Sequence, residues 1–195
     1  MAAEEQDQRY MTDIHLLRRA REGESQAFDS LFQNHKDGVY ACLWHLLDGE
    51  PDAVEEAVGA VFLSAWRGLP GFRMESSFST WLYRIAVNEG RACLRRKRRQ
   101  RMFGWFSFSE QDSAVVAQYS DPTADALRDE ETRELWRAVR ALPEPYRTPT
   151  ILRYMSGLDS REIATVLRRP CGTIRYQLSR AMQLLRERLG GVWLD

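Results

Sequence analysis

Residues 157–189 read GLDSREIATVLRRPCGTIRYQLSRAMQLLRERL, and their pattern predicts two helices separated by a tight turn. Asp159 precedes Glu162 by three residues, which is the spacing of a capping box at the start of a short helix. The segment Arg168–Pro170 is expected to end that helix. Apolar side chains recur every three or four residues along the second helix, namely Cys171, Ile174, Leu178, Ala181 and Leu185. One face of the second helix is therefore expected to be buried.

The opposite face of the second helix is polar and basic, and it carries Thr173, Arg175, Tyr176, Gln177 and Arg180. In a helix-turn-helix the second helix lies in the major groove of DNA, which is wide enough to admit it. Arg175 and Arg180 suit guanine edges or phosphates, and Gln177 suits adenine. Ser160 and Arg161, at the start of the first helix, suit phosphate contacts. The alternative is a helical hairpin whose arginines are only solvated.

Charge along the chain is strongly segregated, although the formal net charge is zero. Residues 1–90 hold 8 basic and 15 acidic side chains, and residues 91–101 hold 7 basic and none acidic. Residues 102–135 hold 2 basic and 8 acidic side chains, and residues 136–195 hold 11 and 5. Segregation of this kind is typical of a protein that binds charged partners. The basic last block favours DNA binding over a solvated hairpin.

Nearly every periodic stretch is helical, and no strand pattern is present. Helices are expected over residues 13–34 with a break at Gly23 and a continuation to Leu47, over 53–69, and from 134 to 189. Ser77 is expected to cap a further helix that continues to about Arg99. Residues 102–132 are acidic and weakly periodic, and begin with four aromatics: Phe103, Trp105, Phe106 and Phe108. We expect these rings to pack onto one of the domains, and the alternative is a contact with polymerase or a regulator. The predicted fold is all-α, with two small helical domains (10–101 and 133–190) joined by a flexible linker (102–132).

The stretch SSFSTWLYRIAVN (76–88) leads directly into an arginine tract. On a helix from Phe78, one face holds the apolar residues Phe78, Leu82, Ile85 and Ala86. Another face holds polar and basic residues with Trp81 at its margin, namely Thr80, Arg84, Asn88, Arg91 and Arg95. Such a face suits single-stranded nucleic acid, because bases stack on aromatic rings while cations hold phosphates. In the alternative interpretation Trp81 and Tyr83 pack against a neighbouring helix. It is favoured for Tyr83, and both remain open for Trp81.

Several motifs together resemble the extracytoplasmic-function sigma factors, the small two-domain members of the sigma-70 family. Residues 13–99 resemble sigma region 2 through AREGESQAFDSLF, DAVEEAVGAVFLSAWRGL and FRMESSFSTWLYRIAVN. Residues 134–189 resemble region 4 through LPEPYRTPTILRYMSGLDSREIATVL and CGTIRYQLSRAMQLLRERL. The resemblance implies a promoter-specificity subunit that binds core RNA polymerase, reads the −35 element as duplex and captures the unwound −10 element. It also implies control by an anti-sigma factor.

The resemblance also implies roles for individual residues. The loop around residues 72–77 is expected to accept a flipped-out base of the −10 element, through Phe72, Arg73, Ser76 and Ser77. Contacts with polymerase are expected from Asp52, Glu55, Glu56, Phe62 and Trp66. Residues 56–60 read EAVGA where the family typically carries Asp-Leu-Val-Gln-Glu, so polar contacts are lost and a helix-weakening Gly59 is gained. Polymerase binding is then expected either to be weaker or to rely more on Asp52, Glu55 and Glu56.

The sequence gives little support for other classes of protein. Cys42, Cys93 and Cys171 are widely spaced, which argues against a disulfide framework or a zinc site, and no metal or cofactor is expected. The histidines, His15, His35 and His45, lack a matched nucleophile, so we expect no enzyme such as a recombinase. With no signal peptide and no apolar run of about 18 residues, a cytoplasmic protein is expected. The principal rival is a stand-alone helix-turn-helix regulator.

Overall fold

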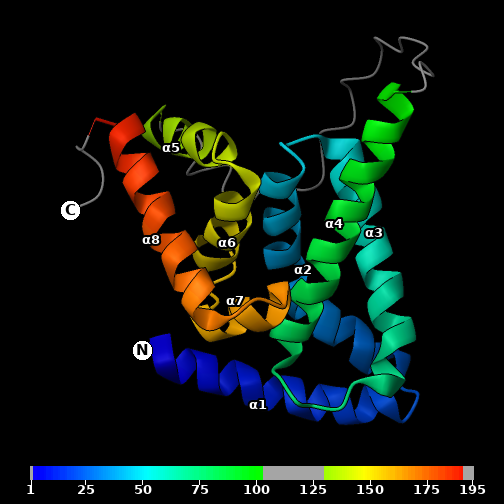
Figure 1. Cartoon of the computed structure of the whole chain (residues 1–195). Coiled ribbons are helices and arrows are strands. Elements are labelled where there is room, and N and C mark those ends of the chain that lie inside the picture. The colour runs from blue at the N-terminus through cyan, green and yellow to red at the C-terminus, as the bar shows by residue number, and fades with distance from the viewer. Residues whose placement is uncertain (1, 103–129, 191–195) are drawn as a thin grey trace.

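The computed structural model describes residues 2–102 and 130–190, and every regular element in these ranges is a helix (Figure 1). The elements are α1 (Ala2–Arg21), α2 (Ser25–Leu46), α3 (Pro51–Gly68), the 3-10 turn η1 (Leu69–Gly71), α4 (Phe78–Met102), α5 (Glu130–Arg140), α6 (Glu144–Tyr154), α7 (Ser160–Leu167) and α8 (Cys171–Arg188). The all-α prediction is confirmed. Phe103, Trp105, Phe106 and Phe108 lie outside the described residues.

The helix ends follow from local sequence. Gly23 separates α1 from α2 with φ +94°, a left-handed conformation that favours glycine. The Ser77 hydroxyl accepts a hydrogen bond from the Thr80 amide at 3.2 Å, so Ser77 caps α4 as expected. Pro143 and Pro145 lie at the start of α6, whereas Pro149 lies inside it.

Helices α1 to α4 form the first bundle, in which α2, α3 and α4 pack on one another and α1 lies across α2. Its core is apolar, with Phe28, Leu31, Val54 and Leu82 almost completely buried. One buried polar contact ties α1 to α2, because His35 Nε2 lies 2.7 Å from Asp13 Oδ2. Because α4 packs on α2 and α3, its expected apolar stripe, which includes Phe78 and Leu82, faces these two helices.

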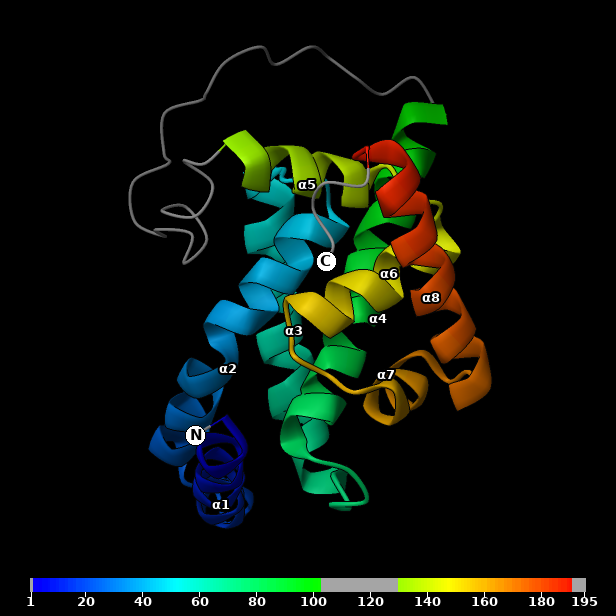
Figure 2. The same ribbon diagram turned by 90° about the vertical axis from the view of Figure 1, so that its left-hand side faces the viewer.

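Helices α5 to α8 form the second bundle, built around Ile151, Leu152, Ile163 and Ile174. This bundle packs directly on the first one (Figure 2). Helix α7 contacts α4, and both α5 and α6 contact α2. The two bundles therefore share an extensive interface, which hydrophobic periodicity alone does not predict.

The described helices include none that is long and apolar enough to cross a membrane. Residues 2–102 and 130–190 likewise contain no cluster of three or more His, Cys, Asp or Glu side chains that could hold a metal ion.

Candidate nucleic-acid and polymerase interfaces

Helices α7 and α8 form the predicted helix-turn-helix. Asp159 Oδ1 accepts hydrogen bonds from the amides of Arg161 and Glu162 at 2.7 and 2.8 Å. Glu162 Oε2 in turn accepts the Asp159 amide at 2.9 Å, which completes the capping box. Helix α7 ends at Leu167, and the following residue, Arg168, adopts a left-handed conformation with φ 52°. The chain thus turns sharply between the two helices, as their sequence predicts.

The polar face of α8 is largely free of contacts with the first bundle. Thr173, Arg175 and Tyr176 are exposed, with Tyr176 at 64%. Arg180 is half-buried and donates a hydrogen bond to Gln183 at 3.1 Å. On α7, Arg161 is exposed and Ser160 is half-buried. These side chains form one surface that suits duplex DNA.

Gln177 lies apart from the other α8 residues expected to read DNA. It is 8% exposed, and its Oε1 accepts a hydrogen bond from Arg169 at 3.4 Å. Position 177 follows Ile174 by three residues, so it falls on the edge of the buried stripe. Its amide is engaged within the helix-turn-helix in this conformation.

The polar face of α4 is exposed at some positions and covered by the second bundle at others. Asn88 and Arg95 are exposed and Arg84 is half-buried. Thr80, by contrast, is only 3% exposed and donates a hydrogen bond to Glu162 of α7 at 3.2 Å. Arg91 forms a 2.8 Å ion pair with Glu144 at the start of α6. Part of the predicted single-strand surface therefore faces the second bundle.

The aromatic residues at the start of α4 form a packed cluster. The Trp81 ring centroid lies 5.0 Å from that of Phe72 and 5.6 Å from that of Phe78, and Trp81 is 9% exposed. Tyr83 is buried against α2 beside Gly38, as expected. Within the preceding loop, Arg73 is exposed, whereas Ser76 and Ser77 are half-buried. In this conformation the Trp81 ring therefore packs against the loop through its contact with Phe72.

Helix α3 presents a mixed acidic and apolar surface. Asp52, Glu55 and Glu56 are exposed, and Glu56 pairs with Arg96 of α4 at 2.7 Å. Farther along the helix, Leu63 and Trp66 are 50% and 40% exposed. Phe62 and Trp66 both stack edge-on against the Phe28 ring beneath them. Exposed apolar groups on a rigid aromatic base are typical of a protein-binding surface.

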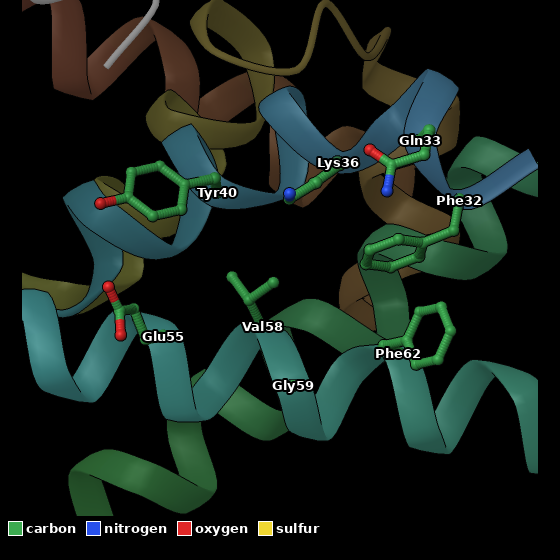
Figure 3. Close-up of a pocket in the computed structure, with 8 residues that line it drawn as sticks. All are labelled: Phe32, Gln33, Lys36, Tyr40, Glu55, Val58, Gly59 and Phe62. Carbon is green, nitrogen blue, oxygen red and sulfur yellow. The ribbon is translucent and has the colours of Figure 1, made fainter. Parts of the chain in front are cut away.

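A pocket of about 330 Å³ lies between α2 and α3, next to this surface (Figure 3). It is lined by Phe32, Gln33, Lys36, Tyr40, Glu55, Val58, Gly59 and Phe62. A Cβ atom at Gly59 would have no neighbour within 4 Å, so the glycine leaves the pocket wall open. The sequence did not indicate that α2 residues line this pocket, because the pocket forms only where α2 and α3 pack side by side.

Two sigma-70 families match the chain. Residues 31–101 match Sigma-70 region 2, and residues 132–185 match Sigma-70, region 4. The chain is 32% identical over 190 residues to the RNA polymerase sigma-H factor of Pseudomonas aeruginosa, covering 95% of this chain and 94% of that protein. It is also 32% identical over 181 residues to the ECF RNA polymerase sigma-E factor of Escherichia coli strain K12, with 90% and 93% covered.

Solved structures share the fold. CnrH, solved in complex with the cytosolic domain of CnrY, superposes with a TM-score of 0.68 at 21% identity, covering 93% of this chain and 99% of that one. The sigma factor RpoE of Bartonella quintana, solved with the anti-sigma factor NepR, gives a TM-score of 0.63 at 24% identity, covering 84% and 96%.

Proposed function

The chain belongs to the extracytoplasmic-function sigma factors of the sigma-70 family, and from this premise we propose which of its surfaces carries out each step of promoter recognition. It is an RNA polymerase sigma factor, which binds core polymerase and promoter DNA in the cytoplasm and itself catalyses no reaction. The first bundle serves as region 2 and the second bundle as region 4.

The −35 element is read as duplex by α8. Arg175 and Tyr176 enter the major groove and contact base edges, while Ser160 and Arg161 hold the phosphate backbone. The observation that supports this role is the exposure of Thr173, Arg175 and Tyr176 on one side of a helix whose other side is buried. Arg180 extends the same surface along the groove.

The unwound −10 strand is held by the polar face of α4. Asn88, Arg84 and the arginines that follow bind its phosphates and bases, and the loop around Arg73 and Ser76 receives a flipped base. The packed rings of Phe72 and Trp81 make a rigid floor for that loop. Extrusion of a base costs a few kcal/mol, so a preformed floor favours the open strand.

Core polymerase docks on α3 and the adjoining pocket. Leu63 and Trp66 supply exposed apolar area, Asp52 and Glu55 supply charge, and the pocket beside Gly59 accepts a side chain from the polymerase. Bartonella quintana RpoE was solved with an anti-sigma factor. We propose that a protein of that kind regulates this chain as well.

Run-off transcription with bacterial core polymerase tests the proposal. Transcripts from defined start sites are expected only when the protein is present, and the mapped starts identify both promoter elements. Tight duplex binding without transcription would replace the proposal with a stand-alone regulator.

Two variants separate the proposed surfaces, and each serves as the control for the other. Arg175→Ala is expected to retain core polymerase and lose about 1–3 kcal/mol of −35 discrimination. Trp66→Ala is expected to weaken core binding by about 2 kcal/mol or more and leave duplex contacts intact. Equal loss of core binding in both variants would contradict this division.

A further inference from the structure

The aromatic floor of the base-binding loop, formed by the rings of Phe72 and Trp81, packs in turn on a third ring. The Phe78 ring centroid lies 6.3 Å from that of Phe72, at an interplanar angle of 80°, and 5.6 Å from that of Trp81. Phe78 is the first residue of α4 and is 2% exposed. Edge-to-face and tilted ring pairs at these separations attract one another. The position of Phe78 therefore sets the position of the floor.

A histidine of α2 packs against the same ring. The centroids of His35 and Phe78 lie 5.3 Å apart and their planes meet at 61°, which is an edge-to-face contact. His35 is 7% exposed, so its protein neighbours rather than solvent decide its orientation. An edge-to-face contact is directional, because rotation of one ring withdraws its edge from the face of the other. The orientation of the His35 ring therefore affects where Phe78 lies.

Asp13 of α1 fixes that orientation. His35 Nε2 lies 2.7 Å from Asp13 Oδ2, and Asp13 is 5% exposed. Because a carboxylate only accepts hydrogen bonds, Nε2 carries the hydrogen between the two side chains. A short hydrogen bond to one ring nitrogen holds the ring in place, as it does for histidines that must keep one orientation in metal sites. Helix α1 lies at the end of the first bundle where the base-binding loop lies (Figure 1), and it contacts η1, which precedes that loop.

The Asp13–His35 pair is a costly way to attach a helix. Asp13 Oδ1 is buried and has no hydrogen-bond partner among the described residues. A buried carboxylate with an unsatisfied oxygen lowers stability in a way that an apolar pair of similar size would not. Leu17, one turn farther along α1, is 2% exposed and already anchors this helix by apolar contact. Attachment of α1 alone therefore does not account for the pair, whereas the orientation of a ring does.

We propose that Asp13 and His35 are positioning residues for −10 recognition: Asp13 orients the His35 ring, and His35 holds Phe78 and, through it, the aromatic floor of the base-binding loop. This inference rests on the proposed function, since it concerns how the same loop is prepared for its base. A loop that already has its binding conformation loses less free energy when it captures a base. Neither Asp13 nor His35 contacts DNA in this arrangement.

Base-specific binding by the polymerase complex tests the proposal. The probe is a labelled single strand with the non-template sequence of a promoter mapped by run-off transcription, and it is titrated with the full chain bound to core polymerase. Further strands carry an abasic site at each position of the −10 element in turn, which removes one base and keeps its phosphate. The wild-type complex is expected to lose at least about tenfold in affinity at the captured position and much less elsewhere.

The quantity compared between variants is the capture ratio, defined as the affinity for the intact strand divided by the affinity for the strand that lacks the captured base. A smaller folded fraction lowers both affinities equally, so it leaves this ratio unchanged. The ratio therefore reports on the base-binding loop and is insensitive to a general loss of stability.

Two variants break the chain of contacts at different points. His35→Gln keeps an N–H group for Asp13 and removes the ring that packs on Phe78, whereas Asp13→Ala keeps the ring and removes its acceptor. Each is expected to reduce the capture ratio to about threefold or less, while affinity for the abasic strand stays within about twofold of wild type. Asp13→Asn still offers an acceptor oxygen and is expected to retain most of the ratio.

Leu17→Ala is the matched control, because it loosens α1 and leaves the Asp13–His35 pair intact. It is expected to lower stability and to keep the full capture ratio. An equal fall of the ratio in Leu17→Ala would overturn the proposal, since general attachment of α1 would then explain the effect. A full ratio in either His35→Gln or Asp13→Ala would also overturn it.

The outcomes separate this inference from the proposed function. If the wild-type complex loses no more affinity at one abasic position than at the others, the proposed capture of a base fails, and the inference fails with it. If the wild type shows a captured position and the two variants keep the full ratio there, the proposed function stands and only the positioning role is wrong.

Discussion

Gly38 and Gly59 show two opposite consequences of a missing side chain. A Cβ at Gly38 would lie 2.3 Å from the hydroxyl oxygen of the buried Tyr83, so the Tyr83 side chain fits against α2 only because this residue is glycine. A Cβ at Gly59 would meet nothing within 4 Å. The first glycine is required by packing, whereas the second lines the pocket and weakens its helix.

Substitution by alanine should therefore change stability in opposite directions. Gly38→Ala is expected to lower the free energy of unfolding by about 1–3 kcal/mol, because the buried Tyr83 ring must shift. Gly59→Ala should raise it by about 0.5–1 kcal/mol. Urea denaturation of both variants measures the difference, and a loss at Gly59 would show that the open pocket wall has a structural role.

Cys42 makes stability depend on alkaline pH. Burial raises the pKa of its thiol to about 12, although the neighbouring Ser156 hydroxyl opposes the rise. The unfolded chain loses this proton near pH 8.5, well before the folded chain does. The contribution is therefore fully present below about pH 8.5 and is lost as pH rises towards 12, by up to about 1.4 kcal/mol per pH unit.

Cys42→Ala should remove this dependence. Between pH 9 and 11 the variant's free energy of unfolding is expected to fall less steeply than that of the wild type, by about 1 kcal/mol per pH unit. Urea titrations at several pH values measure both slopes. The small cavity in the variant lowers the free energy of unfolding equally at every pH, and the other groups titrate alike in both proteins, so neither affects the difference between the two slopes. Parallel curves of free energy against pH would contradict the assignment to Cys42.

At the scale of the element, α1 is held to the first bundle by a buried polar pair. Asp13 and His35 are 5% and 7% exposed, and their side chains meet at 2.7 Å. His35→Ala leaves the Asp13 carboxylate buried without this partner, and should cost about 3 kcal/mol. Hydrogen exchange should then rise selectively in α1, whereas Asp13→Asn, which can still hydrogen-bond, should change it far less. A uniform rise in exchange would argue against a local role.

Helix α7 has eight residues and depends on its cap. Asp159→Ala removes the acceptor for two backbone amides and should destabilise the second bundle by about 1 kcal/mol. Asp159→Ser retains a capping hydroxyl and should lose only a few tenths of that amount. Thermal denaturation of the two variants gives the comparison. Equal losses would show that the charge of Asp159, rather than its capping geometry, stabilises α7.

The elements themselves could be predicted because each has a local cause. Each of these helix boundaries depends on residues no more than four positions apart: the capping box at Asp159, the break at Gly23 and the cap at Ser77. The contact between Glu162 and Thr80 joins residues 82 positions apart. Glu162 already had a complete local explanation in the capping box, so its sequence context contained no sign of a second partner. Helical periodicity places Gln177 on the polar face of α8. This position lies at the edge of the buried stripe, and only the packing of the neighbouring residues decides whether such a position is buried.

At the scale of the whole molecule, the buried apolar residues of the two bundles form one continuous core, and polar contacts and ion pairs add to the interface. Ion pairs such as Arg91–Glu144 are partly exposed, and each is worth at most about 1 kcal/mol. The stack of Trp136 on His45 is buried and contributes more. An interface of this composition can be stable in the folded chain and still open transiently.

Opening of the interface can be followed through the reactivity of one native thiol. Cys42 is 1% exposed and faces Ser156 of the second bundle, so alkylation requires the bundles to part. Trp136→Ala removes the stack on His45 and is expected to raise the rate of Cys42 alkylation at least about tenfold, because that rate follows the population of the open state. Mass spectrometry resolves each site.

Cys93 provides the internal control. It is 3% exposed within α4 of the first bundle, and its alkylation requires that bundle to loosen. Acceleration at Cys42 alone would mean that the bundles separate as intact units. Equal acceleration at Cys93 would mean that Trp136 stabilises the entire fold, and that the two bundles unfold together rather than part.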